Sequence, residues 1–218
     1  MVTRAENFGG VSDAGLLLVK LAAFAVMILD HVDWFLYGGA LGINATIGRA
    51  VFPAFAAVLG INLARMNVPG MYRLTSRLLL AGAVASVPYT LLQGELLPLN
   101  VLWSLAAAVV MVTFLRHGSR LGALLVWIPA GLFLDYQWCG LAAVVGAWWL
   151  ASRGFRGAFL LAALLVVPFN GSWWSLAVLP LALAAGTLPA GPAPRWKWLF
   201  YVGYPAHLVV LALLEHVL

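Results

Sequence analysis

The chain alternates long apolar segments with short polar connections. The apolar segments are continuous, whereas the strands of a membrane barrel alternate apolar and polar residues, so the pattern predicts helices. Nine segments have this character: residues 16–36, 46–64, 75–92, 98–115, 120–135, 137–151, 157–171, 172–188 and 197–216. A helix that crosses a bilayer needs about 20 mainly apolar residues. The sequence therefore predicts an all-α, polytopic transmembrane helix bundle with about nine spans.

The fifth and sixth segments are short for a bilayer. We expect them either to cross with little tilt or to lie inside the bundle. The first segment carries Lys20, Asp30 and Asp33, so we interpret it as a retained span and not as a cleavable signal peptide. Residues 1–15 then form a short cytoplasmic N-terminal segment, and residues 16–218 form a single transmembrane domain.

The composition excludes a water-soluble globular protein. Of the 218 residues, 64% are hydrophobic and 9% are charged, whereas a soluble domain carries about 25% charged residues to cover its surface. The single cysteine, Cys139, excludes an internal disulfide and a zinc site built from several cysteines.

The basic residues predict the orientation in the membrane. Eleven of the twelve precede or open the first segment, or lie around the connections after the second, fourth, sixth and eighth: Arg4, Lys20, Arg65, Arg73, Arg77, Arg116, Arg120, Arg153, Arg156, Arg195 and Lys197. The positive-inside rule then places the N-terminus in the cytoplasm and the C-terminus outside. Because these charges orient the chain in the lipid bilayer, the net charge of +5 does not indicate a nucleic-acid partner.

Ionisable residues gather near the outer end of the first segment. Asp30, His31 and Asp33 lie there, and Arg49 enters the second segment from the same side across a short connection. An ionisable side chain within a membrane is costly unless it is paired or solvated, so each is a candidate functional residue. Met27, Asp30, His31 and Trp34 have the i, i+3, i+4, i+7 spacing of one helix face, which Asp33 borders.

Two interpretations of this cluster stay open from the residues alone. A histidine beside carboxylates suits a general base. Alternatively, Asp30 and Arg49 form a structural ion pair between two helices, and His31 is a satisfied interior polar group.

Further polar residues are candidates for a cavity lining. His207 lies near mid-depth in the last segment, after Tyr204 and Pro205, either as a functional group or within a kinked packing helix. Four others stand near the outer ends of segments, where they line a cavity or act as interfacial anchors and caps: Tyr89, Asn100, Asp135 and Tyr136.

An ordered set of short motifs resembles the TraX family. The motifs are Lys20-Leu-Ala with Met27-Ile-Leu-Asp30-His31, Gly48-Arg49-Ala-Val-Phe52-Pro53-Ala-Phe55, Ser86-Val-Pro-Tyr89, Leu99-Asn100-Val, Asp135-Tyr136 and Tyr204-Pro205-Ala-His207-Leu. That family is known for N-terminal acetylation of conjugative pilin, and it is similar to multi-span acyltransferases that use a histidine near the end of their first helix. The resemblance implies a multi-pass acetyltransferase of the bacterial inner membrane that uses acetyl-CoA and no metal. Its acceptor would be pilin or another small membrane or envelope molecule.

The resemblance and the polar cluster together give a hypothesis for individual residues. Arg73 and Arg77 would bind the phosphates of acetyl-CoA. His31 would act as general base or carry the acetyl group, and Asp30 would orient it. Arg49 or Tyr89 would stabilise the oxyanion. The expected substrate contacts are Asp33, Tyr89, Asn100, Asp135, Tyr136 and His207, the last of which could also carry a proton.

Three other functions stay open. In a small proton-coupled transporter, Asp30, His31 and Arg49 would form a relay, although the sequence shows no inverted repeat. A non-enzymatic assembly factor for pilin or another membrane protein would not depend on His31 or Asp30. An intramembrane hydrolase or metalloenzyme is disfavoured because no His-Glu-x-x-His pair is present.

Overall fold

The computed structural model describes residues 11–189, 193–194 and 196–217, and within these ranges it contains helices and no strand. The α-helices are α1 (Asp13–Tyr37), α2 (Val51–Arg65), α3 (Val68–Gln93), α4 (Val101–Arg116), α5 (Arg120–Phe133), α6 (Gln137–Ser152), α7 (Ala158–Asn170), α8 (Val178–Gly186) and α9 (Lys197–Val217). Two 3₁₀ helices, η2 (Ile47–Ala50) and η3 (Trp173–Ala177), lead into α2 and α8. Each predicted segment overlaps one α-helix, which confirms the all-α class.

Polar caps and a left-handed glycine set several helix ends. The Ser12 side chain accepts a hydrogen bond from the Gly15 N–H at the start of α1, and Asn67 does the same for Gly70 at the start of α3. At its other end α1 stops at Gly38, whose φ of 60° is the left-handed conformation that glycine adopts at little cost.

Two predicted boundaries are corrected. The first helix begins at Asp13, inside the predicted N-terminal segment, and α3 begins at Val68 because an asparagine cap and a proline in the first turn start the helix early. Arg73 therefore lies on α3 and not in the connection before it. Arg4, Arg195 and most of the predicted segment 1–15 lie outside the described residues.

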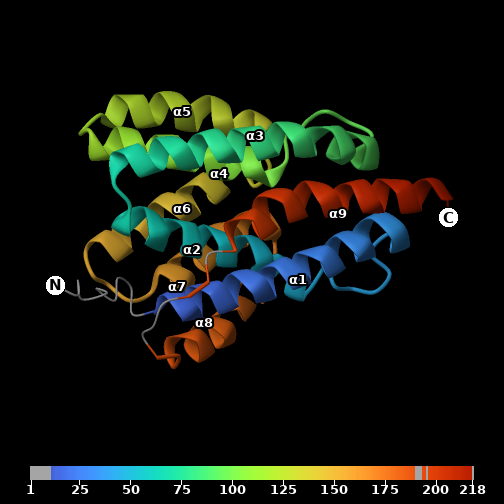
Figure 1. Ribbon diagram of the computed structural model, residues 1–218, viewed down its shortest axis with the longest axis horizontal. Coiled ribbons are helices and arrows are strands. Elements are labelled where there is room, and N and C mark those ends of the chain that lie inside the picture. The colour runs from blue at the N-terminus through green and yellow to red at the C-terminus, as the bar shows by residue number, and fades with distance from the viewer. Residues whose placement is uncertain (1–10, 190–192, 195, 218) are drawn as a thin grey trace.

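The helices run side by side in layers (Figure 1). On one side lie α3, α4 and α5, and on the opposite side lie α1 and α8. Between them α2 packs against α1, α6 and α7. The last helix, α9, contacts both α1 and α3, so the last helix lies beside the first.

Small residues let α2 and α6 pack closely. A Cβ added at Gly60 of α2 would lie 2.6 Å from the Cβ of Ala147 on α6, so nothing larger than hydrogen fits. Close backbone approach through small residues is typical of helix contacts in membranes. α2 is accordingly buried along most of its length, and it forms one wall of the site described below.

The two short segments differ in position. The sixth segment follows the second of the two predicted alternatives. Its helix α6 lies inside the bundle, because Leu141, Val144 and Ala147 are fully buried. By contrast, Leu121, Leu125 and Leu132 of α5 are each more than 60% exposed. Of the two alternatives for the fifth segment, a place inside the bundle does not hold, because its apolar side chains face outwards at the periphery.

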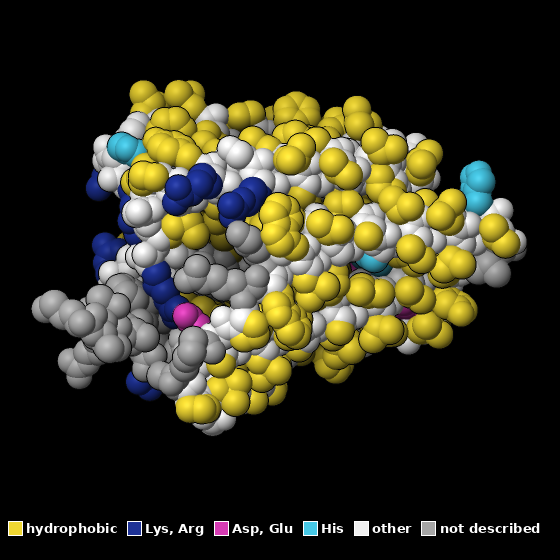
Figure 2. Space-filling model, viewed as in Figure 1, with side chains coloured by type: hydrophobic (Ala, Val, Ile, Leu, Met, Phe, Trp, Pro, Cys, Tyr) yellow, Lys and Arg dark blue, Asp and Glu magenta, His cyan; other side chains and the backbone are white. Residues whose placement is uncertain are grey.

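The surface has the distribution expected of a membrane protein. Figure 2 shows apolar side chains across most of the visible face, with Lys and Arg gathered at one end. We call it the basic end. Arg65, Arg116 and Arg153 stand at the ends of α2, α4 and α6. Four helical segments are long and apolar enough to cross a membrane: Asp13–Tyr37, Ile47–Arg65, Val68–Gln93 and Trp198–Val217. The number of spans and the orientation stay predictions.

Candidate active site

A pocket of about 380 Å³ lies at the end of the bundle opposite the basic end. Its polar lining consists of Asp30, His31, Asn44, Arg49, Tyr89, Gln93, Asp135, Tyr136 and Tyr204. Its apolar lining includes Met27, Trp34, Phe52, Phe55 and Phe169. We call it the His31 pocket. The predicted convergence of Asp30, His31 and Arg49 is confirmed, and so is the helix face that carries Met27 and Trp34 beside them.

The imidazole of His31 is held by a second histidine. Nδ1 of His31 lies 2.7 Å from Nε2 of His207, and the two rings stack with centroids 5.0 Å apart and planes 12° apart. Nδ1 of His207 lies 3.1 Å from the carbonyl oxygen of Gly203. A carbonyl only accepts hydrogen bonds, so His207 carries its proton on Nδ1 and presents the lone pair of Nε2. His31 must then donate from Nδ1, which leaves its Nε2 as a proton acceptor.

This chain of contacts replaces one that the sequence predicted. We expected Asp30 to orient His31, but neighbouring residues on a helix do not face each other. The carboxylate of Asp30 turns instead to the α1–α2 connection, where Oδ1 accepts a hydrogen bond of 3.0 Å from Nδ2 of Asn44. The orienting contact comes from His207, which stands 176 positions along the chain from His31.

Asn44 links the two charged residues of the cluster. Its Oδ1 accepts a hydrogen bond of 3.3 Å from the Arg49 guanidinium, while its Nδ2 donates to Asp30. Within the described residues Asp30 and Arg49 form no direct ion pair. Gly48 abuts the Asp30 carboxylate, and a Cβ there would collide with Oδ1. The Gly48-Arg49 pair thus admits the carboxylate and places the guanidinium beside it.

Asp33 organises the connection that carries Asn44. Its side chain is fully buried, and its two oxygens accept hydrogen bonds from the backbone N–H groups of Leu41 and Asn44, at 2.8 and 2.9 Å. These contacts fold the connection back over the end of α1. The predicted substrate contact at Asp33 has no place in the lining of the His31 pocket.

Replacing Asp33 with alanine is therefore expected to destabilise the protein. Two backbone N–H groups lose their hydrogen bonds to a buried carboxylate, and a hydrogen bond to a charged group is worth about 1.5–3 kcal/mol. The free energy of unfolding in detergent measures the loss. The matched control is Asp13→Ala, which removes an exposed ion pair with Arg65 worth at most about 1 kcal/mol. Equal effects of the two substitutions would contradict the role assigned to Asp33.

Aromatic rings form the wall opposite α1. Tyr136 has a positive φ of 59° and stacks on Phe52 of α2, with centroids 3.8 Å apart. Asp135 accepts a hydrogen bond of 2.8 Å from the Tyr136 N–H, so its carboxylate stays at the pocket. Tyr89 reaches the pocket from α3. These three predicted residues thus lie together as expected.

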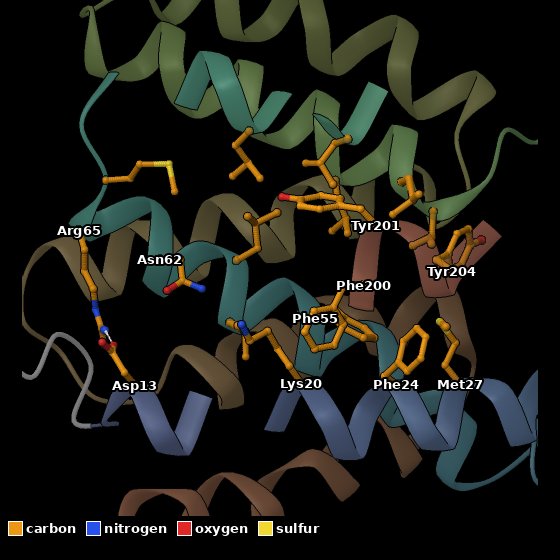
Figure 3. Close-up of a pocket in the computed structure, with 18 residues that line it drawn as sticks. Asp13, Lys20, Phe24, Met27, Phe55, Asn62, Arg65, Phe200, Tyr201 and Tyr204 are labelled. Carbon is orange, nitrogen blue, oxygen red and sulfur yellow. Dashed lines mark hydrogen bonds and ion pairs between the residues drawn. The ribbon is translucent and has the colours of Figure 1, made fainter. Parts of the chain in front are cut away.

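A second, larger cavity lies between the pocket and the basic end. It has a volume of about 570 Å³ and lies between α1, α2, α3, α4 and α9 (Figure 3). It shares Met27, Phe55, Val101 and Tyr204 with the His31 pocket. At its other end it shares Arg65, Met66, Leu74 and Tyr201 with a basic mouth, which Arg73 and Arg77 also line. We call these three adjacent spaces the passage.

Comparison with known protein families places the chain in one of them. The family model described as TraX protein matches residues 16–215, nearly the whole chain. The chain belongs to the TraX family. This family is associated with conjugative pilin processing and is linked to pilin acetylation. No curated protein and no solved structure matches the chain.

The TraX motifs divide into pocket and support. Asp30, His31, Arg49, Tyr89, Asp135 and Tyr136 line the pocket, whereas His207 supports His31 from behind. Asn100 does not line it. Its side chain donates to the Gly82 carbonyl and Ser86 and caps α4 by accepting from the Leu102 N–H. That is the cap that the sequence left open as an alternative.

Three polar residues of the pocket lining escaped the sequence prediction. Asn44 stands in a connection without charge, Gln93 closes α3, and Tyr204 was noted only as part of a motif. The signal for Asn44 was its place between two charged residues, Asp33 and Arg49, in the sequence.

Within the described residues no group of three His, Cys, Asp or Glu side chains could hold a metal ion.

Proposed function

We propose that this TraX protein is an acetyltransferase of the bacterial inner membrane that moves the acetyl group of acetyl-CoA to the N-terminal amine of a pilin subunit. One observation carries the proposal: His31, with Nε2 as proton acceptor, lines the pocket at one end of the bundle, next to the large cavity that extends towards the basic end. A base at the junction of two access routes suits transfer between two substrates that arrive from opposite sides.

The donor would enter at the basic mouth from the cytoplasm. Arg73 and Arg77 line this mouth, and guanidinium groups are the preferred partners of phosphate. The walls beyond are largely apolar, with side chains such as Phe55, Leu74 and Leu78. An uncharged pantetheine arm suits these walls, and it would carry the thioester to His31.

The chemistry is a direct aminolysis of the thioester. Nε2 of His31 removes a proton as the acceptor nitrogen forms a bond to the carbonyl carbon. The Arg49 guanidinium and the Tyr89 hydroxyl are the donors available for the negative oxygen of the tetrahedral intermediate. The carbon–sulfur bond then breaks, and the proton on Nε2 passes to the leaving thiolate. The products are the acetylated amine and free CoA, and His31 returns to its starting state.

The experiment is acetyl transfer by purified protein in lipid nanodiscs. Labelled acetyl-CoA is offered with a membrane peptide that carries a pilin N-terminus, in one form with a free amine and in another with a blocked amine. We expect label on the free amine only. Label on neither peptide, from protein that keeps its helical content, would contradict the proposal.

The passage also suits a small transporter, because it runs from one end of the bundle towards the other. Proteoliposomes separate the two functions. A transporter accumulates substrate in vesicles without changing it covalently, whereas the acetyltransferase produces acetylated peptide and free CoA.

A further inference from the structure

A lysine stands inside the passage without a direct ion pair to any carboxylate among the described residues. Lys20 lies in the second turn of α1 and lines the large cavity, where its side chain points away from α1 into the space (Figure 3). Its ammonium sits 5.2 Å from the centre of the Phe200 ring. Asp13, the acidic residue in the lining, is engaged 2.5 Å from Arg65, and within the described residues Lys20 has no ion pair.

This arrangement is costly unless a ligand compensates for it. An ammonium inside a membrane protein is unfavourable without a counter-charge, and one aromatic ring compensates for only part of this cost. The neighbours in the cavity wall are mainly apolar, including Phe24, Phe55 and Leu59. An anion that enters the cavity would supply the counter-charge for the Lys20 ammonium.

We propose that Lys20 binds the pyrophosphate of the CoA donor, and that Arg73 and Arg77 at the mouth bind its outer phosphate. This inference rests on the proposed function. The shared chemistry is a phosphate ester on a long uncharged arm, which an anionic lipid could also offer, so the experiment separates the two sources.

The spacing along α1 supports this assignment. Lys20, Phe24, Met27 and His31 follow at i, i+4, i+7 and i+11, which is three turns along one face. All four line the passage. From Lys20 to His31 the helix rises by eleven residues, or about 16 Å.

A pantetheine arm has a matching length. About a dozen backbone bonds separate its pyrophosphate from its thioester, which is roughly 15 Å when extended at ~3.5 Å for every three bonds. With the pyrophosphate at Lys20, the thioester therefore reaches His31. The apolar side chains of Phe24 and Met27 stand along the uncharged part of the arm.

The experiment compares binding of two ligands, CoA and acetyl-pantetheine, which lacks the pyrophosphate. Calorimetry uses protein in nanodiscs of uncharged phosphatidylcholine. We expect Lys20→Met to weaken CoA binding about tenfold or more, as loss of a charge-assisted contact does, with acetyl-pantetheine binding unchanged within about twofold. Lys20→Arg keeps the charge and should keep most of the affinity. Arg120→Met removes an exposed charge at the start of α5 and should change neither.

Several outcomes would overturn the inference. The first is an affinity of Lys20→Met for CoA equal to that of wild type. The second is an equal loss of affinity for CoA and for acetyl-pantetheine. The third is a wild-type protein that does not bind CoA. Loss of co-purified phosphatidylglycerol in Lys20→Met, with CoA binding intact, would assign the lysine to a lipid instead. Binding that depends on Lys20 without any acetyl transfer would support this inference and contradict the proposed function. Acetyl transfer with the same KM for acetyl-CoA in wild type and Lys20→Met would support the proposed function and contradict this inference.

Discussion

Replacing His31 with alanine is expected to lower the rate of acetyl transfer by about 10²–10⁴-fold, the usual contribution of a general base. The loss should fall on kcat, since His31 stands beyond the cavity that would hold the pantetheine arm. Binding of CoA should change little. The measurement is the initial rate of label transfer to the free-amine peptide, alongside calorimetric affinity for CoA.

The matched control is His117→Ala. This histidine caps α4 at the basic end, is exposed, and contacts the carbonyl of Thr113, so its loss should leave the rate unchanged. A His31→Ala protein with a rate within about threefold of wild type would contradict the assignment, because a general base contributes at least about 10²-fold.

An experiment on the wild-type protein distinguishes whether His31 acts as a general base or as a nucleophile. If His31 carries the acetyl group, wild-type protein mixed with acetyl-CoA and no acceptor would gain an acetyl mass on the peptide that contains His31. Direct aminolysis leaves that peptide unmodified. We expect the unmodified peptide, because the hydrogen bond from Nδ1 to His207 suits a base that must hold and return one proton.

Local periodicity predicted the α1 part of the site. The spacing of Met27, Asp30, His31 and Trp34 places them on one helix face, and the structure keeps them at one pocket. The short connection before Arg49 limited the distance between the side chains of Arg49 and Asp30. Such inferences hold because helix geometry is fixed over a few turns.

Contacts between distant helices could not be predicted in the same way. Nothing in the chain indicates that α9 packs beside α1 so that His207 meets His31, since packing of apolar helices leaves no periodic signal that names the partner. Gly203 permits the approach, because a Cβ there would lie 2.8 Å from the Phe24 ring. Asp33 was misjudged for a related reason: its partners are backbone N–H groups of a connection whose path the sequence does not specify.

Replacing His207 with leucine is expected to lower kcat by about 10²-fold or more, since loss of the group that fixes the tautomer of a catalytic histidine costs up to ~10⁴-fold in serine proteases. Leucine cannot accept the hydrogen bond from Nδ1 of His31, so Nε2 would no longer be held as the acceptor. The KM for acetyl-CoA should stay within about threefold, because His207 does not line the pocket. Separate determination of kcat and KM tests both statements.

His207→Gln distinguishes tautomer control from simple packing. The amide oxygen of glutamine can accept the hydrogen bond that leucine cannot, so this variant should recover part of the lost rate. The ¹⁵N chemical shifts of His31 report which ring nitrogen carries the proton, and they should show Nδ1–H in wild type and in His207→Gln, and a mixture in His207→Leu. If both variants lose the same activity while His31 keeps one tautomer throughout, His207 serves only to pack α9 against α1. If instead activity follows the tautomer, the carbonyl of Gly203 controls the base at His31 through His207, across the contact between the first and last helices.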